Sequence, residues 1–247
     1  MHPRLAKLSQ ALQHPRLAMA RIRQGLLLDE LIVMNDRRRR GLFDGITTVI
    51  DAGAHYGQYA RICAHILSSA KIICFEPVPA TFEILKRSVQ GNPRITPYCL
   101  ALGSHDETVS MNVSGIDHAS SILAMTDSHK SHWPESAASH PVDIQVTTLD
   151  SFVSKNPISG HIYLKADVQG FELELLKGAK NILKQVRVMR LEISLIQLYE
   201  GAPRLSEICA FLEEAGFRFH SIAGDVTGAK SELPLQTDFV FVRDDYK

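Results

Sequence analysis

The stretch Thr48-Val49-Ile50-Asp51-Ala52-Gly53-Ala54-His55-Tyr56-Gly57 decides the fold of this chain. A β-branched run ends in Asp51, and two glycines follow it where a helical pattern of apolar residues begins. A second apolar run, at 71–75, ends in Glu76-Pro77. Strands that carry a glycine loop and then an acidic residue at their carboxyl ends are typical of the nucleotide-binding half of a doubly wound α/β domain.

The glycine spacing indicates which ligand this loop suits. Gly53 leaves the strand where a Cβ would clash, and Gly57 opens a helix whose free N–H groups face the ligand. A dinucleotide loop reads G-x-G-x-x-G, but His55 replaces the second glycine here and no third glycine is in register. The bulkier loop favours the amino-acid tail of S-adenosylmethionine (SAM). Asp51 is predicted to hold its ammonium group and Glu76 its ribose hydroxyls; the alternative is an ordinary βα turn with an acidic strand end.

Composition limits the class of protein. The chain has 247 residues, of which 45% are hydrophobic, enough for one full α/β core. Lys+Arg and Asp+Glu are both 27, so we expect no nucleic-acid partner that depends on a basic surface. The basic run at 37–40 is interpreted as a solvated helix end, with a contact to an anionic substrate or membrane surface as the alternative.

The spacing of the cysteines and the length of the apolar runs indicate the cellular compartment of the protein. Cys63, Cys74, Cys99 and Cys209 are scattered without a C-x-x-C pair, which suits thiols in a reducing compartment. The sequence begins without a signal-peptide pattern, and its longest apolar run is too short to span a bilayer. The sequence therefore predicts a cytoplasmic protein without a transmembrane segment, and a homo-oligomer is possible.

Apolar periodicity predicts an α/β fold with a doubly wound, mostly parallel, seven-stranded sheet and a terminal hairpin, the methyltransferase variant. Residues 1–45 are predicted to be an N-terminal helical extension or lid, and 46–247 the main domain. A β insertion is expected at about 104–147, with a substrate-facing loop at 114–141. The expected strands are 47–51, 71–75, 95–100, 161–165, 187–195, 217–222 and 238–242, with 108–113 and 142–147 in the insertion.

Six segments occur in an order that resembles the FkbM family of SAM-dependent methyltransferases. They are 49–57, Phe75-Glu76-Pro77, Ala101-Leu102-Gly103, Ser120-Ser121, Thr148-Leu149-Asp150 and Leu164-Lys165-Ala166-Asp167-Val168-Gln169-Gly170-Phe171-Glu172. The resemblance covers about residues 46–243 and implies a class I fold, SAM as donor, and O-methylation of a sugar or natural-product hydroxyl. It implies a cofactor site made of Asp51, Gly53, Ala54, His55, Gly57, Glu76, Pro77, Ala101, Leu102, Ser121 and Asp167.

Two positions depart from the family pattern. His55 stands where Asn is frequent, so its contact with the SAM carboxylate is expected to differ. Gln169 stands where the family has Glu, which makes it unsuitable as a base. Ser120 and Ser121 are predicted either to hydrogen-bond SAM or to form a plain ST-turn.

Asp167 and Glu192 are the predicted catalytic residues. Asp167 ends the fourth strand, where it would orient or deprotonate an acceptor hydroxyl; a helix N-cap is the alternative. Glu192 lies on the buried fifth strand, so it is either paired with an Arg or functional. A divalent cation between the two carboxylates is a weaker alternative, and no metal is predicted.

The loop of the insertion is rich in histidine. Residues His118, His129, His132 and His140 lack the ligand pattern of a zinc site, so they are interpreted as solvated, with one general base among them as the weaker alternative. Trp133 would either stack on a sugar face or pin the loop to the domain.

These features together predict a SAM-dependent O-methyltransferase. The predicted acceptor is a small hydroxylated molecule, with a sugar of a glycosylated metabolite or lipo-oligosaccharide favoured. One alternative is a SAM-binding protein without activity. The other is an NAD-dependent oxidoreductase, which the absence of G-x-G-x-x-G and of a Tyr-x-x-x-Lys pair disfavours.

Overall fold

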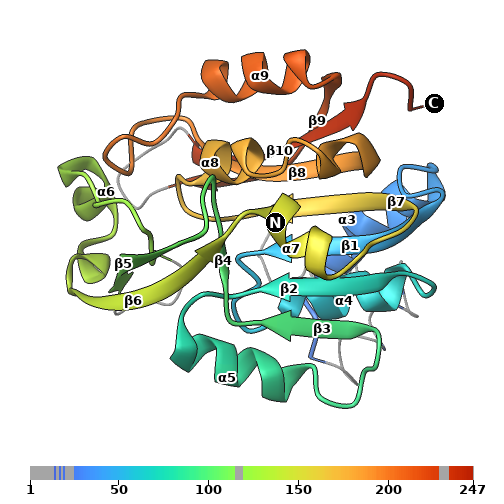
Figure 1. Cartoon of the computed structure of the whole chain (residues 1–247), viewed down its shortest axis with the longest axis horizontal. Coiled ribbons are helices and arrows are strands. Elements are labelled where there is room, and N and C mark those ends of the chain that lie inside the picture. Colours follow the sequence, from blue (N-terminus) through green and yellow to red (C-terminus); the bar gives the residue numbers. More distant parts are fainter. Residues whose placement is uncertain are drawn as a thin grey trace.

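A seven-stranded sheet forms the centre of the computed structural model, which describes His14, Leu17, Met19 and residues 25–114, 119–227 and 234–246. The strand order is β3-β2-β1-β7-β8-β10-β9, and only β10 runs antiparallel to its neighbours (Figure 1). This order confirms the predicted doubly wound sheet with a terminal hairpin. The strands are β1 (Ile46–Ala52), β2 (Lys71–Phe75), β3 (Ile95–Tyr98), β7 (His161–Ala166), β8 (Val186–Ser194), β9 (Phe217–Thr227) and β10 (Pro234–Arg243).

Helices cover both faces of this sheet. One face packs against α3 (Leu28–Arg39), α4 (Gln58–Ile66) and α5 (Pro79–Ser88). The other packs against α7 (Leu149–Lys155), α8 (Glu172–Lys177), η2 (Ile182–Gln185) and α9 (Leu205–Glu214). Two hydrophobic clusters result, one on each side, because strands buried on both faces carry apolar residues at consecutive positions.

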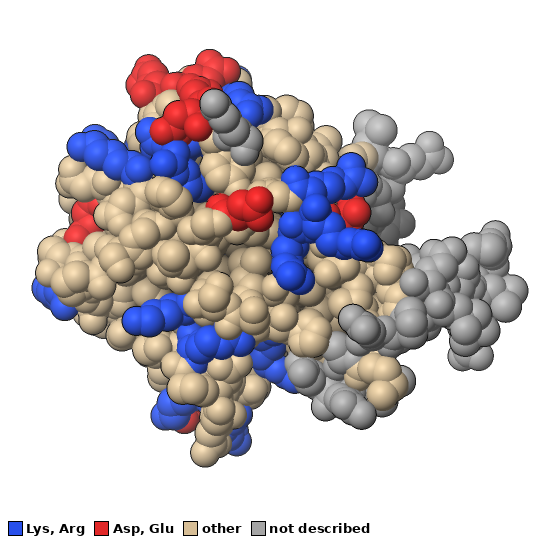
Figure 2. Space-filling view, turned by 90° about the vertical axis from the view of Figure 1, so that its right-hand side faces the viewer, with Lys and Arg blue, Asp and Glu red and all other residues tan. Residues whose placement is uncertain are grey.

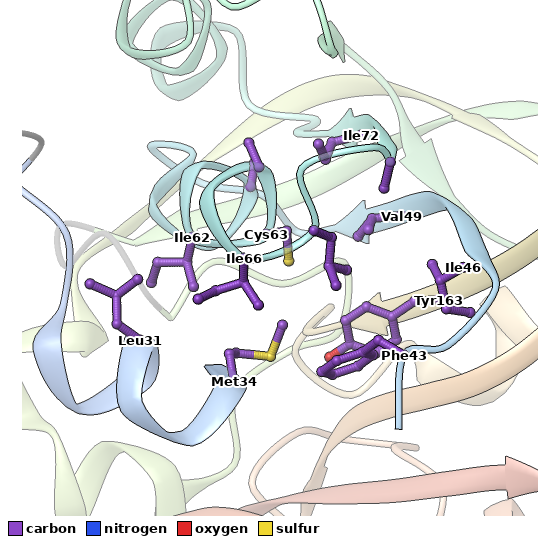
Figure 3. Packing of buried hydrophobic residues seen from close by; sticks show 14 of the residues in the cluster. Leu31, Met34, Phe43, Ile46, Val49, Ile62, Cys63, Ile66, Ile72 and Tyr163 are labelled. Atoms are coloured by element: carbon purple, nitrogen blue, oxygen red, sulfur yellow. The ribbon is translucent and has the colours of Figure 1, made fainter. Parts of the chain in front are cut away.

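The helix α3 closes the first of these clusters. Its Leu31 and Met34 are fully buried and lie against Ile62 and Ile66 of α4, as Figure 3 shows. Of the predicted extension at 1–45, most residues before Gly25 lie outside the part of the chain that the structure describes. From residue 28 onward the predicted helix is present and continues to Arg39.

The basic run at 37–40 lies at the carboxyl end of α3, where positive charge suits the helix dipole. Arg37 donates a hydrogen bond to the carbonyl of Ile222 on β9, and Arg40 pairs with Asp36 at 2.8 Å. Figure 2 shows the described Lys and Arg side chains of one face in several separate groups. These contacts support the interpretation of the run as a helix end.

A second, three-stranded sheet lies beside the main one, at the left of Figure 1. Its order is β4-β6-β5, from β4 (Ala101–Leu102), β5 (Glu107–Ser114) and β6 (Ser139–Thr147). The segment 114–141, predicted to be a substrate-facing loop, has regular structure of its own. The described part of that segment contains α6 (Asp127–His132) and η1 (Pro134–Ala137), and an antiparallel bridge joins Met125 to Tyr199.

The carboxyl ends of the parallel strands β1, β2 and β7 meet at one edge of the main sheet, and the insertion stands over that edge. Ligands of open α/β sheets bind at this edge, beside the point where the strand order reverses. That point lies between β1 and β7, so the loops after these two strands position the site. Among the described residues, no helix is both long and apolar enough to cross a bilayer.

Candidate active site

A cavity of about 440 Å³ opens at this edge, a size typical of small-molecule sites. Both the strand-end loops and the insertion line it. Of the residues predicted from sequence, the lining includes Gly53, His55, Glu76, Pro77, Ala101, Leu102, Asp167 and Glu192. Four others are not among the lining residues: Asp51, Ala54, Gly57 and Ser121.

The loop after β1 passes unusually close to the loop after β7. Gly53 has φ +74°, and a Cβ there would lie 1.9 Å from the carbonyl oxygen of Asp167. Gly57 has φ +78° at the start of α4, and a Cβ there would lie 2.6 Å from a methyl carbon of Leu85. Only glycine fits either position, so the backbone itself forms this wall of the cavity.

Glu76 fits the ribose of a nucleoside ligand. Its side chain is almost buried, with 5% exposure, and its two oxygens accept hydrogen bonds from the N–H groups of His55 and Val78, both at 3.0 Å. Each carboxylate oxygen has a second lone pair that a ligand hydroxyl can use. Burial raises the pKa of Glu76 to about 7, so donors from a ligand would favour its ionised form.

Asp51 lies beneath the cavity-lining loop, beside a cation of the chain itself. It is fully buried beneath the loop, and neither oxygen has a hydrogen-bond partner among the described residues. The Nζ of Lys165, its register neighbour on β7, lies 3.7 Å away. The cation that faces Asp51 therefore comes from the chain itself, and its predicted contact with a ligand ammonium remains a prediction.

Lys165 is a residue that the sequence reasoning missed. Its Nζ lies 3.3 Å from Asp167 Oδ2 and 3.4 Å from the carbonyl of Gly53. Burial alone would lower its pKa, but the carboxylates of Asp167 and Asp51 raise it, so it stays charged. A lone Lys inside the apolar run 161–166 was the signal that could have identified it.

The two predicted catalytic carboxylates converge through Gln169. Its Nε2 donates to Asp167 Oδ1 and to Glu192 Oε2, each at 2.7 Å, while its Oε1 accepts from the hydroxyl of Tyr199 at 2.7 Å. Gln236 also donates to Glu192, at 3.3 Å. No Arg among the described residues pairs with Glu192, and Asp167 does not cap α8, which begins at residue 172.

The surroundings shift the pKa values of Asp167 and Glu192 in opposite directions. Burial alone would raise the pKa of Asp167, but Lys165 and hydrogen bonds from Glu192 and Gln169 lower it. Burial and the nearby charge of Asp167 raise the pKa of Glu192 well above its usual range. At neutral pH Asp167 is thus ionised, and it keeps 33% of its side-chain surface exposed and lines the cavity, while the raised pKa of Glu192 favours its protonated form.

The two serines of the insertion have separate positions. Ser120 lines the cavity and accepts a hydrogen bond from the N–H of Ser114 at 3.1 Å. Ser121 is fully buried: its hydroxyl donates to the carbonyl of Gln169 at 2.7 Å and accepts from the N–H of Leu123. Ser121 thereby holds Gln169 in its left-handed conformation, with φ +52°.

The insertion supplies the outer wall of the cavity. Its lining side chains are Met111, Ile122, His129, Trp133 and Glu135. The interpretation of the histidines as solvated is wrong for His129, which is 3% exposed, whereas His140 is exposed and His118 lies outside the described residues. Among the described residues, no group of three or more His, Cys, Asp or Glu side chains is arranged to hold a metal ion.

A buried ionic cluster lies behind the site. Arg190 of β8 pairs with Glu30 of α3 and with Asp238 of β10, the latter at 2.7 Å. Its guanidinium also lies over the ring of Tyr59, 5.1 Å from the centroid. The cluster joins the N-terminal helix to the centre of the sheet, and the sequence pattern had not identified it.

The strand order, the close-packed glycine loop and the acidic residue after β2 define a SAM-dependent methyltransferase of class I. The profile of the Methyltransferase FkbM domain matches residues 51–219, and the chain belongs to this family. Membership of this family sets aside the two alternative functions, an NAD-dependent oxidoreductase and a SAM-binding protein without activity.

Individual relatives are distant. NoeI of Sinorhizobium fredii, a 2-O-methyltransferase, is 24% identical over 194 residues, which cover 76% of this chain and 78% of NoeI. AglP of Haloferax volcanii, a hexuronic acid methyltransferase, is 30% identical over 144 residues, 58% of this chain and 54% of AglP. A solved structure of a putative tRNA (m1A22) methyltransferase from Streptococcus pneumoniae, in complex with SAM, aligns with 90% of this chain and 75% of its own at 12% identity and a TM-score of 0.49.

Proposed function

We propose that this methyltransferase transfers the methyl group of SAM to a hydroxyl group of a sugar. The observation that carries the proposal is the ionised carboxylate of Asp167 at the floor of a cavity with an aromatic outer wall. The names of NoeI and AglP, a 2-O-methyltransferase and a hexuronic acid methyltransferase, support a sugar acceptor.

The strand-end loops would hold the donor. Glu76 would accept hydrogen bonds from the two ribose hydroxyls, and the loop at 53–57 would enclose the amino-acid tail. The cavity has an acidic lining, which suits a donor that carries a sulfonium charge. When bound there, SAM supplies an electrophilic methyl carbon.

Asp167 would then act as the general base. The acceptor oxygen forms its bond to the methyl carbon, the carbon–sulfur bond breaks with its electron pair left on sulfur, and the hydroxyl proton passes to Asp167. The raised pKa of Glu192 favours its protonated form, in which it would donate a hydrogen bond that stabilises the ionised Asp167. Lys165 offsets the buried negative charge.

The test is transfer of labelled methyl from SAM to a panel of methyl glycosides. Asp167→Asn should lower kcat by about 10²–10⁴-fold, the usual contribution of a general base, while the dissociation constant of S-adenosylhomocysteine stays within a few-fold. Asp127→Asn, an exposed substitution in α6, is the matched control and should leave both unchanged. Wild-type turnover in the Asp167→Asn variant would remove Asp167 as the base. Non-sugar alcohols are assayed beside the glycosides, and labelling of these alcohols without labelling of any glycoside would overturn the acceptor class.

A further inference from the structure

His129 is a buried histidine that lines the cavity without belonging to the donor side. Its Nδ1 lies 3.1 Å from the hydroxyl of Ser136, and its Nε2 lies 3.4 Å from the hydroxyl of Tyr199. The helix that carries it is anchored to the main domain, because Thr126 donates to the carbonyls of Gln197 and Leu198. The imidazole is thus held in place before any ligand arrives.

The surrounding hydrogen bonds decide which ring nitrogen carries the proton. The hydroxyl of Ser136 donates to the carbonyl of Trp133 at 2.6 Å, so it accepts from His129 Nδ1–H. The hydroxyl of Tyr199 donates to Gln169 at 2.7 Å, so its proton is not directed at His129 Nε2. The lone pair of Nε2 is therefore left for a donor from the cavity.

The state of His129 suits an acceptor of hydrogen bonds. Burial, together with His132 and Lys130, lowers its pKa, so the ring is neutral at neutral pH and Nε2 keeps its lone pair. The ring of Trp133 lies beside it, with 5.0 Å between the centroids, and also lines the cavity. A hydrogen-bond acceptor next to a flat aromatic face matches a sugar ring, which presents hydroxyls at its rim and C–H groups on its faces.

The charged residues that line the cavity indicate which kind of sugar the site prefers. Among the described residues that line it, four are acidic (Glu76, Glu135, Asp167 and Glu192) and none is Lys or Arg. A carboxylate on the acceptor would meet the ionised Asp167, and none of the described lining residues is a Lys or Arg that could pair with it, which costs binding free energy.

We propose that α6 and η1 form an acceptor subsite for a neutral pyranoside, in which His129 Nε2 accepts a hydrogen bond from a second, non-reacting hydroxyl and Trp133 packs against the ring face. This subsite rests on the proposed sugar methylation and deepens it. It also gives the chain a preference for neutral sugars over hexuronates, since the described lining supplies no cation to a carboxylate.

Trp133 is the single tryptophan of the chain, so its fluorescence reports on this subsite directly. The full chain, saturated with S-adenosylhomocysteine, is titrated with neutral methyl pyranosides and with methyl glucuronide. A neutral pyranoside should change the emission, and the glucuronide should bind more weakly. His129→Phe should weaken the neutral pyranoside about 2- to 12-fold, as expected for one neutral hydrogen bond, and His129→Gln should restore part of the loss.

His140→Ala is the matched control, because His140 also belongs to the insertion but lies exposed on β6. In turnover assays His129→Phe should raise the acceptor KM and leave kcat within a few-fold. Pyranoside affinity and KM that are unchanged in His129→Phe, or a glucuronide that binds better than the neutral sugars, would overturn the subsite. Labelled methyl transfer to glycosides in those same variants would show that the proposed function still stands.

Discussion

A single methyl group at position 53 would overlap the backbone of the neighbouring loop, since an added Cβ would lie 1.9 Å from the carbonyl oxygen of Asp167. Gly53→Ala should therefore abolish binding of S-adenosylhomocysteine in titration calorimetry. Gly91→Ala is the matched control, because Gly91 also has a positive φ, +85°, but no atom lies within 4 Å of its added Cβ. Equal affinity in both variants would contradict the donor position.

Glu76 gives the donor site a pH dependence. Its pKa is about 7 in the free protein, and ribose hydroxyls that donate to it would lower that pKa in the complex. Affinity for S-adenosylhomocysteine should thus rise as pH increases through about 7, because the free carboxyl no longer has to lose a proton on binding.

The Glu76→Gln variant is the comparison for that titration. It should weaken S-adenosylhomocysteine by about 1.5–3 kcal/mol, the value of a hydrogen bond to a charged group, and its affinity should not vary with pH near 7. Calorimetry between about pH 5.5 and 8.5 checks both statements. A wild-type dissociation constant that is flat over this range would exclude the ribose contact.

At the residue scale the sequence predicted which strand ends carry the site but not the partner of each side chain. Glu76 and Asp167 line the cavity because the carboxyl ends of parallel strands share one edge. The placement of Asp51 depends on Lys165 of the neighbouring strand, and the placement of Ser121 depends on the carbonyl of Gln169. Neither pairing can be predicted from the spacing of these residues in the sequence. The bridging role of Gln169 follows from its left-handed backbone, which a single sequence does not reveal.

At the scale of elements, the contact between α3 and the sheet includes a buried ion pair. Glu30→Gln should lower the free energy of unfolding by about 3–5 kcal/mol, because Arg190 would lose a carboxylate in a place with little water. Glu83→Gln is the matched control, since Glu83 pairs with Lys86 at the surface with 55% exposure. The control should change stability by less than about 1 kcal/mol, as measured by urea unfolding.

Equal losses in the two variants would mean that α3 is held by its apolar contacts alone. Leu31 and Met34 supply those contacts, and both lie within the segment predicted to be a helical extension. The helix α6 was not recognisable, because its sequence, Asp127-Ser-His-Lys-Ser-His132, has neither an apolar stripe nor strong helix formers. It forms where Thr126 caps its first turn and where the 197–200 segment packs against it.

At the scale of the whole molecule, Glu172 contributes to a dependence of stability on pH. Burial raises its pKa to about 7, although the N–H groups of Val168 and Gly170 donate to it. A carboxyl whose pKa is higher in the folded than in the unfolded state stabilises the fold below its unfolded pKa, near 4.5. That contribution, about 3 kcal/mol in full, is lost as pH rises through about 7.

Urea unfolding of the ligand-free protein checks this sign. The free energy of unfolding of the wild type should fall more steeply between about pH 5 and 7.5 than that of Glu172→Gln, which keeps an acceptor oxygen but does not titrate. Parallel pH profiles would show that Glu172 is ionised in the folded protein.

The topology of the whole molecule was predictable because its glycine and acidic motifs lie at the carboxyl ends of β1, β2 and β7 in a chain of α/β periodicity. The way in which the insertion covers the cavity was not predictable, because it depends on long-range contacts such as the one between Met125 and Tyr199. Local patterns fixed the order of the strands, whereas side-chain pairs far apart in the sequence fix the shape of the cavity.

The approach of Gly53 to Asp167 also has a mechanical consequence. The N–H of Asp167 donates to the carbonyl of Ala52, and the Nζ of Lys165 lies within reach of both loops, 3.4 Å from the carbonyl of Gly53. With no room between the two backbones, neither loop can shift without displacing the other. The glycine loop and the loop that carries Asp167 are therefore expected to move as one unit, which preserves the spacing between them.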